Sequence, residues 1–503
     1  MLNLCKKIFI FCTFSFILEK IHRAFSSHAW QLKYEFFEYF KRNDLHMNFT
    51  SARKGPQIDL LNGNIFASMI IFSIPILFSN LFQELYNTVD TIIIGHALGE
   101  NALAAAGAAA PVYELLIGFA LGIGNGLSLM TSRSYGLKDM ELLKRSVAVS
   151  ITIGTGISLV IAVLTRFYLR PFLILLHTPA SILQDTYEYI SVITLFAGIM
   201  FAYNLCAGLL RAIGNSLMPL VFLFLSSVLN IVLDLFCILE LGMGMKGAAV
   251  ATVASQTVSV LLCLIYIFRY ARILIPEKKH FRYDRHLYGE MAAQGFSMGF
   301  MSSIVSAGTA ILQAGINDLG ALIIAGHTTA RKLMQFEIMP FSAMITSVST
   351  FVSQNYGADQ VLRIRKAMKY AYIYNAVITL ILTGANLLFA SSLVQLLSGS
   401  AESTLVQNGT LYLQVVAPFY FILGLVTNTR SALQSIGSTI LPLFSSIVEL
   451  IGKIIFVILF IPRFQYQAVI WCEPVIWCFM ALELMWAFWR NPYISDVQTK
   501  NNF

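Results

Sequence analysis

The sequence predicts an all-α polytopic membrane protein, with twelve transmembrane helices in two six-helix lobes related by a pseudo-two-fold axis along the membrane normal. Three observations predict this fold class: the composition, the spacing of the apolar segments, and a repeat of the first half in the second. Of the 503 residues, 57% are hydrophobic and 12% are charged, whereas soluble domains carry about 25% charged residues. Such a composition is typical of a chain that lies mostly in a bilayer.

The apolar segments match the length of a membrane-spanning helix, which needs about 20 residues. We expect twelve spans, over residues 65–94, 105–132, 146–168, 187–210, 216–239, 245–269, 291–317, 322–354, 367–396, 405–434, 439–461 and 466–489. Lysine and arginine gather in the loops after the second, sixth and eighth spans and are sparse on the other side. Because basic loops stay in the cytoplasm, we expect both termini there and the protein in the inner (cytoplasmic) membrane.

Short motifs of the first half recur in the second half. "SYGLKDMELLKR" from Ser134 matches "NYGADQVLRIRK" from Asn355, at an offset of 221 residues, and "LLRAIGNSLMPL" from Leu209 matches "ALQSIGSTILPL" from Ala432, at an offset of 223. An even number of helices in each repeat gives both halves the same orientation in the membrane. The predicted organisation is an N-lobe of residues 56–270, a cytoplasmic linker of 271–289, a C-lobe of 290–490 and a cytoplasmic tail of 491–503.

Residues 1–55 do not follow this pattern and are treated as an N-terminal extension. Residues 8–18 are apolar, follow two lysines, and are too short to span a bilayer comfortably. Two interpretations stay open. The segment is either a signal peptide or surface-lying amphipathic helix, or Met47 is the true start and the upstream residues are a mis-called extension.

Several function classes are disfavoured by what the sequence lacks. The seven cysteines are scattered and form no disulfide framework. No GxxxxGK[ST] loop is found, so ATP does not drive this chain by itself and any transport must run on an ion gradient. The net charge of +8 is explained by the basic loops, so no nucleic-acid partner is expected. We find neither a nucleophile–base pair, nor a metal-binding motif, nor a selectivity filter, which disfavours an enzyme or a passive channel.

Acidic and polar residues interrupt three of the predicted spans at a similar depth. Asp90 lies inside the apolar run "LYNTVDTIIIGHALG", where a carboxylate costs roughly 2.5–3.5 kcal/mol and by default suggests a function. Asn230 and Asp234 are one turn apart in the fifth span, and Thr252 lies in the sixth. With a rise of about 1.5 Å per residue, the topology places all of them roughly 8–12 Å below the outer surface. We expect the two acids to converge, with Tyr86 one turn before Asp90.

These side chains offer the ligands of a small cation. Carboxylate, amide and hydroxyl oxygens suit Na⁺, which would be held at Asp90, Asn230, Asp234 and Thr252. Neighbouring carboxylates also hold a proton readily, because they resist double ionisation. H⁺ and Na⁺ both stay open as the coupling ion, and no other cofactor is expected. A purely structural interpretation, in which the polar groups bond to one another and hold the helices together, also stays open.

The second half carries a different polar pattern at the corresponding place. Glu449 and Lys453 are four residues apart in the eleventh span and are expected to pair with one another. The position that matches Asp234 is Lys453 or Val457, neither of which is an acid. We therefore expect the cation site only in the N-lobe.

Two features of the first and second spans bear on motion and packing. Pro75 lies fifteen residues before Asp90, and proline removes a backbone hydrogen bond and permits a kink. Pro75 is either a conformational hinge that responds to the charge state of Asp90 or a static kink. Gly118, Gly122 and Gly126 share one face of the second span and predict close helix packing.

Residues from about 60 to 490 resemble the multidrug and toxic compound extrusion (MATE) family, and within it the DinF-like branch. The motifs that carry the resemblance are "YNTVDTIIIGHALG", "LLRAIGNSLMPL" followed by "NIVLD", "GMKGAAVAT", "LGALIIAGHTTARK", "FVSQNYGA" and "SIGSTILPLFSSIVEL". The resemblance implies a cation-coupled antiporter that exports lipophilic, often cationic organic compounds from a cavity between two lobes. Its DinF-like site matches Asp90, Asn230, Asp234 and Thr252, with Tyr86 nearby, and the proline of the bending first helix matches Pro75. We expect the protein to function as a monomer.

The NorM-like branch of the family adds an acid on the seventh helix and another on the tenth. Here Val305 stands near the first of these positions, and no acid lies around Leu423. A second cation site in the C-lobe is therefore not expected.

The alternative function is a flippase for lipid-linked oligosaccharides, which belongs to the same superfamily. Such a protein needs cationic groups in the central cavity to meet phosphates. The candidates are Arg331, Lys332, Arg211 and Arg430. Most of them lie near predicted helix ends, where basic side chains commonly extend to the membrane surface, so we expect the antiporter instead.

Overall fold

The computed structural model describes residues 57–176, 178–400 and 402–495. The N-terminal extension, and with it the choice of Met47 as the start, lies outside the described residues, as do residues 496–503 of the predicted tail. In the part of the chain that the structure describes, every regular element is a helix.

The first half of the chain forms six membrane spans. They are α2 (Ile65–Leu98), α3 (Glu100–Gly136), α4 (Met140–Leu175), the pair α5 (Leu183–Leu195) and α6 (Ala197–Ala212), α7 (Leu217–Leu235) with the π turn η1 (Phe236–Glu240), and α8 (Gly244–Tyr270). The pair α5 and α6 is bent by 49° at Phe196 and counts as one span.

The second half repeats this order after the linker turns η2 (Arg272–Leu274) and η3 (Lys278–Phe281). Its elements are α9 (Arg285–Asn317), the pair α10 (Ala321–Glu337) and α11 (Met339–Gly357), α12 (Val361–Ser398), α13 (Ser403–Val416) with η4 (Ala417–Phe419) and α14 (Tyr420–Ser435), α15 (Ile440–Ile455) with η5 (Phe456–Phe460) and α16 (Ile461–Phe464), α17 (Tyr466–Trp489), and the short α18 (Pro492–Ser495). The bend of 42° between α10 and α11 lies at Ile338, and Pro340 stands in the first turn of α11, where proline is tolerated because its missing N–H has no helical partner there.

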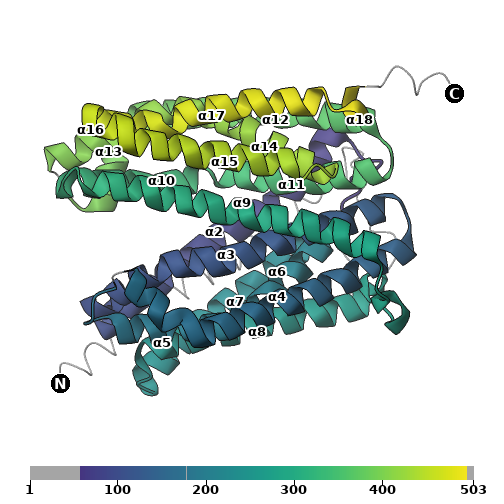
Figure 1. The fold of residues 1–503 in the computed structure, drawn as a ribbon, viewed down its shortest axis with the longest axis horizontal. Coiled ribbons are helices and arrows are strands. Elements are labelled where there is room, and N and C mark those ends of the chain that lie inside the picture. Colours follow the sequence, from purple (N-terminus) through teal and green to yellow (C-terminus); the bar gives the residue numbers. More distant parts are fainter. Residues whose placement is uncertain (1–56, 177, 401, 496–503) are drawn as a thin grey trace, which may run out of the picture. The chain divides into compact units, whose positions relative to one another are not determined.

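The helices confirm the predicted fold class. Among the described residues, ten helices are long and apolar enough to cross a membrane, or up to twelve spans when each bent pair counts as one. In Figure 1 the first six spans (purple to teal) and the last six (green to yellow) form two groups. Several helices extend beyond the predicted apolar segments because polar residues continue them. At α4, for example, the Asp139 side chain caps the helix by accepting from the Leu142 N–H.

The two lobes meet where α3 packs against α9 and α2 packs against α11. A Cβ atom on Gly122 would collide with the backbone at Met298 of α9, and one on Gly126 with the backbone at Gln294. Gly118 instead faces open space. The predicted close packing is therefore confirmed at two of the three glycines, and it joins helices of different lobes.

Hydrogen bonds that join the lobes repeat at equivalent places in the two halves. Arg133, near the end of α3, donates to the carbonyl oxygens of Ser435 (2.8 Å) and Gln434 (3.0 Å) in α14. Gln354, the matching residue of α11, donates from Nε2 to the carbonyl oxygen of Ala212 at the end of α6 (2.8 Å). We call these bonds the interlobe clasp.

Two glycines permit the clasp. Gly136 ends α3 and Gly357 ends α11. A Cβ atom on Gly136 would collide with the Gln354 carbonyl oxygen, and one on Gly357 with the Arg133 carbonyl oxygen. Only glycine lets the ends of the two helices approach this closely.

The linker between α8 and α9 is held against the N-lobe by ion pairs. Lys144 of α4 donates to Glu277 at 2.8 Å, and Arg145 of α4 pairs with Asp284. Asp284 also caps α9, and the Leu287 N–H together with the Arg145 guanidinium holds the pKa of its carboxyl below the usual value. The linker is thereby attached to the first lobe up to the first residue of α9.

Candidate functional site

Three helices of the N-lobe bring the predicted cation-site residues together. Asp90 lies in α2, Asn230 and Asp234 lie on one face of α7, and Thr252 lies in α8. α7 packs against both α2 and α8. The carboxyl groups of Asp90 and Asp234 lie next to each other, and the Tyr86 hydroxyl lies beside the Thr252 hydroxyl, within electrostatic range of both acids. We call Asp90 and Asp234 the acid pair.

The polar atoms around the acid pair are buried and lack protein partners. The exposed fractions of Asp90, Asn230 and Asp234 are 8%, 1% and 0%. Both carboxylate oxygens of Asp234, one of Asp90, both amide atoms of Asn230 and the Thr252 hydroxyl have no hydrogen-bond partner among the described residues. Buried polar groups are nearly always bonded, and an unpaired buried carboxylate is costly. Ionised carboxylates are acceptors only, so the pair needs a proton or a cation between its oxygens.

The donor set fits a monovalent ion. The residues that the structure describes contain no cluster of three or more His, Cys, Asp or Glu that could hold a metal ion. What the site offers is two carboxylates together with the neutral oxygens of Asn230, Thr252 and Tyr86. Hard oxygen ligands of this kind suit Na⁺, or a proton shared between the two acids.

Two tyrosines that the sequence analysis did not single out also belong to this region. Tyr189 of α5 lies within electrostatic range of both acids and of Tyr86 and Tyr113, and Tyr113 comes from α3. The predicted bounds of the fourth span, 187–210, place Tyr189 only two residues from the outer end, so they gave no signal for it. α5 begins four residues earlier, at Leu183, and roughly 1.5 Å per residue from there puts Tyr189 at the depth of the acids.

Pro75 lies inside α2, and the helix continues through it without a break. The Ser79 hydroxyl donates to the Pro75 carbonyl oxygen at 2.9 Å. The role of Pro75 as a hinge stays a prediction.

The C-lobe contains a chain of paired buried charges. Lys453 donates to Glu449 at 3.0 Å, which confirms the predicted pair. Lys453 also lies 3.7 Å from Glu473, and Glu473 accepts from Arg331 at 2.7 Å. We call Arg331, Glu473, Lys453 and Glu449 the C-lobe ion network. Arg331 therefore points toward Glu473 within the lobe, although 32% of its side chain stays exposed.

A polar cavity of about 420 Å³ lies between the lobes. Residues of α2, α3, α6 and α7 line it from the N-lobe, and residues of α9, α11 and α14 line it from the C-lobe. Arg211 and Arg430 are among them. The expectation that basic residues near helix ends extend to the surface is wrong for these two, because both help to form the cavity wall. Lys332 is exposed and takes no part.

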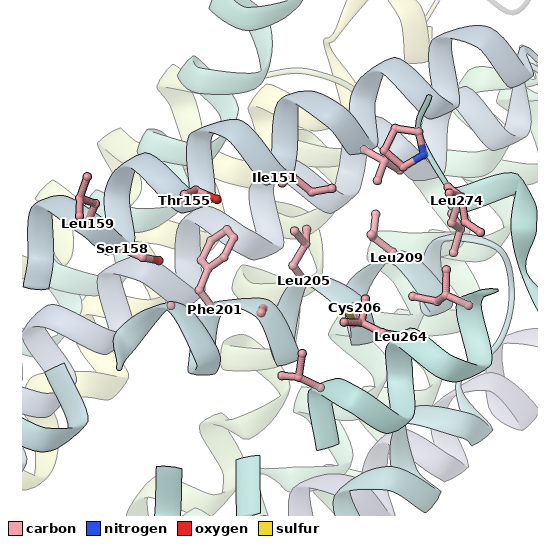
Figure 2. A pocket seen from close by; sticks show the side chains of 18 of the residues that line it. Ile151, Thr155, Ser158, Leu159, Phe201, Leu205, Cys206, Leu209, Leu264 and Leu274 are labelled. Carbon is pink, nitrogen blue, oxygen red and sulfur yellow. The ribbon is translucent and has the colours of Figure 1, made fainter. Parts of the chain in front are cut away.

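A second cavity, of about 540 Å³, lies within the N-lobe and is mainly apolar. Figure 2 shows Phe201, Leu205 and Leu209 of α6 facing Ile151 and Leu159 of α4 across it. The cavity has no charged lining residue among those described. The polar side chains among its described lining residues are Thr155, Ser158 and Cys206, and its mainly apolar wall suits hydrocarbon.

Comparison with known proteins identifies the class. The sequence model of the MatE family matches residues 75–236 and 298–459. The chain is 26% identical over 398 residues to the probable multidrug resistance protein YoeA of Bacillus subtilis (strain 168), with 77% of this chain and 85% of that protein covered. It is 23% identical over 423 residues to the multidrug export protein MepA of Staphylococcus aureus (strain NCTC 8325 / PS 47), with 84% and 93% covered.

The fold is shared with a solved structure, the outward-facing conformation of a multidrug resistance MATE family transporter. The TM-score is 0.80 at 23% sequence identity, with 88% of this chain and 100% of that chain covered. The two family matches begin 223 residues apart, in agreement with the repeat. Fold and matches together define a multi-pass membrane transporter rather than an enzyme. Because the matches span more than half of its length, the chain belongs to the MatE family.

Proposed function

We propose that this protein is a cation-coupled antiporter that exports lipophilic organic compounds by alternating access, with H⁺ or Na⁺ as the coupling ion. The observation that carries the proposal is the acid pair, which is buried in the N-lobe with no basic side chain paired to it among the described residues. The similarity to a probable multidrug resistance protein and a multidrug export protein supports organic compounds as the exported cargo. The family resemblance adds the expectation that the cargo is often cationic.

In the proposed mechanism, the coupling ion neutralises Asp90 and Asp234 and stabilises the conformation in which they are adjacent. Loss of the ion leaves two neighbouring negative charges and favours the other conformation. An ion can drive such a change only through its different affinity for the two states. Asn230, Thr252 and Tyr86 would complete the coordination of Na⁺ or bond to a shared proton.

One helix connects the ion site with the cavity. α2 carries Asp90, and it also lines the central cavity through Ser79, Asn80 and Gln83. A change in the position of α2 on ion binding would therefore alter the cavity wall directly. We propose that Pro75, where the backbone lacks one hydrogen bond, is the hinge for this change.

Three further expectations belong to this proposal. Both termini lie in the cytoplasm, the protein lies in the cytoplasmic membrane, and it works as a monomer. The basic loops support the orientation.

The test uses the full chain in vesicles loaded with a lipophilic fluorescent dye that carries both a cationic group and a carboxylate, under separately imposed proton and sodium gradients. One of the gradients should drive export by the wild-type protein. Asp90→Asn should export no faster than empty vesicles under either gradient, at unchanged expression. The matched control is Asp318→Asn, which removes the same charge from an exposed position and should export like the wild type. Gradient-driven export by Asp90→Asn at the wild-type rate would contradict the coupling role.

A further inference from the structure

The charge of the central cavity points to a preference among possible cargo compounds, on the basis of the proposed export function. None of the described residues that line the cavity is acidic, and two are arginines, Arg211 and Arg430. Most of the remaining polar lining consists of Ser, Thr, Asn and Gln side chains. These neutral groups can accept or donate hydrogen bonds, but they do not balance a positive charge.

Arg211 has no acidic partner in the part of the chain that the structure describes. The titratable groups within its electrostatic range are Tyr203 and Cys263, and neither is ordinarily ionised at neutral pH. Its side chain is half-buried at the end of α6, in the cavity wall. The positive charge of Arg211 is therefore available to a ligand in the cavity.

Arg430 contributes less free charge. Its Nε donates to the Ser445 hydroxyl at 3.0 Å, and a terminal nitrogen lies 3.9 Å from Glu449. Glu449 is already bonded more closely to Lys453, at 3.0 Å, and Glu483 also lies within electrostatic range of Arg430. The charge of Arg430 is thus partly balanced, and Arg211 dominates the field in the cavity.

The two arginines occupy related positions in the repeat. At the offset of 223 residues that separates the family matches, Arg211 of α6 corresponds to Gln434 of α14, and Ala207 of α6 corresponds to Arg430 of α14. All four residues line the cavity. Each wall therefore carries one arginine, and the two sites differ in depth by one helical turn.

The negative charge of the acid pair lies away from this cavity. Gln83 is the residue of α2 nearest to Asp90 that lines the cavity, and Asp90 follows seven residues later, roughly 10 Å further along the helix. The acids lie between α2, α7 and α8. The ion site and the cavity are thus separate regions of opposite charge.

We infer that the central cavity binds the oxyanion of a lipophilic organic compound, either a carboxylate or a phosphate, with Arg211 as the main contact. The planar guanidinium binds such groups through two parallel hydrogen bonds, and a volume of about 420 Å³ suits a drug-sized molecule. Organic cations without an anionic group bind weakly. This preference is the reverse of the one that the family resemblance implies.

The test measures binding to the full chain in lipid nanodiscs without any gradient, so it does not depend on coupled transport. The probes are dansylglycine and dansylethylenediamine, which share one fluorescent body and carry a carboxylate or an amine, with the signal of empty nanodiscs subtracted. Wild-type protein should bind the carboxylate about tenfold more tightly. Arg211→Gln, which copies the residue of the other lobe, should abolish this preference, and Arg211→Lys should keep part of it. Arg463→Gln removes an exposed arginine outside the cavity and should keep all of it.

Equal or tighter binding of the amine, or an unchanged preference in Arg211→Gln, would overturn the inference. Competition by dihexanoylphosphatidate and by inorganic phosphate identifies the source of the oxyanion. Stronger competition by the lipid supports a lipid headgroup, and weak competition by both supports an organic carboxylate. Should Asp90→Asn export normally while the carboxylate preference holds, the coupling proposal alone fails.

Discussion

Among the described residues, each lobe has two buried carboxylates, but the lobes differ in what balances the charge. In the N-lobe, Asp90 and Asp234 lie next to each other, and the neighbouring groups are neutral. In the C-lobe, Glu449 and Glu473 both lie within 4 Å of Lys453. At the offset of the two family matches, Lys453 stands where the N-lobe has Asn230.

Under the proposed function, this difference separates a structural charge from a functional one. Lys453 balances the charge of the C-lobe acids from within the lobe. Asn230 offers an oxygen but no charge, so in the proposed mechanism the N-lobe acids take an ion from solution.

The largest expected effect is on transport, from Asp234→Asn. The variant keeps the shape of the side chain but removes one of the two carboxylates. Asp90 then has no neighbouring carboxylate to repel it, so ion binding no longer changes the repulsion at the site. Export should fall to the rate of vesicles without protein, as in Asp90→Asn. The folded protein should be at least as stable as the wild type, because a buried unpaired charge is gone. If export by Asp234→Asn responded normally to sodium or protons, the two acids would not act together, and the contrast drawn between the lobes would be wrong.

The next largest effect is on stability, from Lys453→Met in the C-lobe. Glu449 then loses its 3.0 Å partner and keeps only the more distant Arg430, at 3.9 Å. Glu473 keeps Arg331 and the Tyr412 hydroxyl. Leaving a buried charge without its partner typically costs about 3–5 kcal/mol, which thermal unfolding in detergent would register as a lower midpoint. The double variant Glu449→Gln with Lys453→Met removes both members of the pair and should recover most of the loss. A single variant as stable as the wild type would show that the network is not structural.

A smaller effect is expected from Thr252→Ala, which removes one neutral oxygen beside the acid pair. The loss of one hydrogen-bonding or coordinating group costs about 1 kcal/mol, so the coupling ion should bind roughly fivefold more weakly. The concentration of Na⁺ or H⁺ that gives half-maximal export reports this change. Thr309→Ala, at the Lys453 side chain of the C-lobe, should leave that concentration unaltered.

The smallest effect is expected from Pro75→Ala. Alanine restores a backbone donor in α2 and stiffens the helix, so we expect roughly threefold slower export with unchanged ion affinity. Wild-type rates at saturating ion concentration would show that the kink is static.

Much of the fold follows from the sequence, because its determinants are local. Apolar segments of sufficient length and a repeat at 221–223 residues predict the twelve spans and the two lobes. The meeting of Asp90 and Asp234 was also predictable, since depth in a membrane follows from distance along a helix. The pairing of Glu449 with Lys453 depends only on their spacing in one helix.

What the sequence did not predict depends on rotation of a helix about its own axis. Arg211 and Arg331 both looked like helix-end residues directed to the surface, yet one lines the cavity and the other pairs with Glu473 from a different helix. The bends at Phe196 and Ile338 also divide spans that are continuous in hydropathy. Only the packing of several helices fixes such orientations.

The interlobe clasp has a consequence for how the two lobes can separate. Arg133 reaches from the first lobe to the second, and Gln354 reaches back from an equivalent position. If the lobes separate as rigid bodies about the axis that relates them, both contacts lengthen in the same movement. We therefore expect no half-opened form in which one bond has broken and the other persists. The contacts between the lobes would break in a single step, so no partly open pathway forms through which ions could leak between transport cycles.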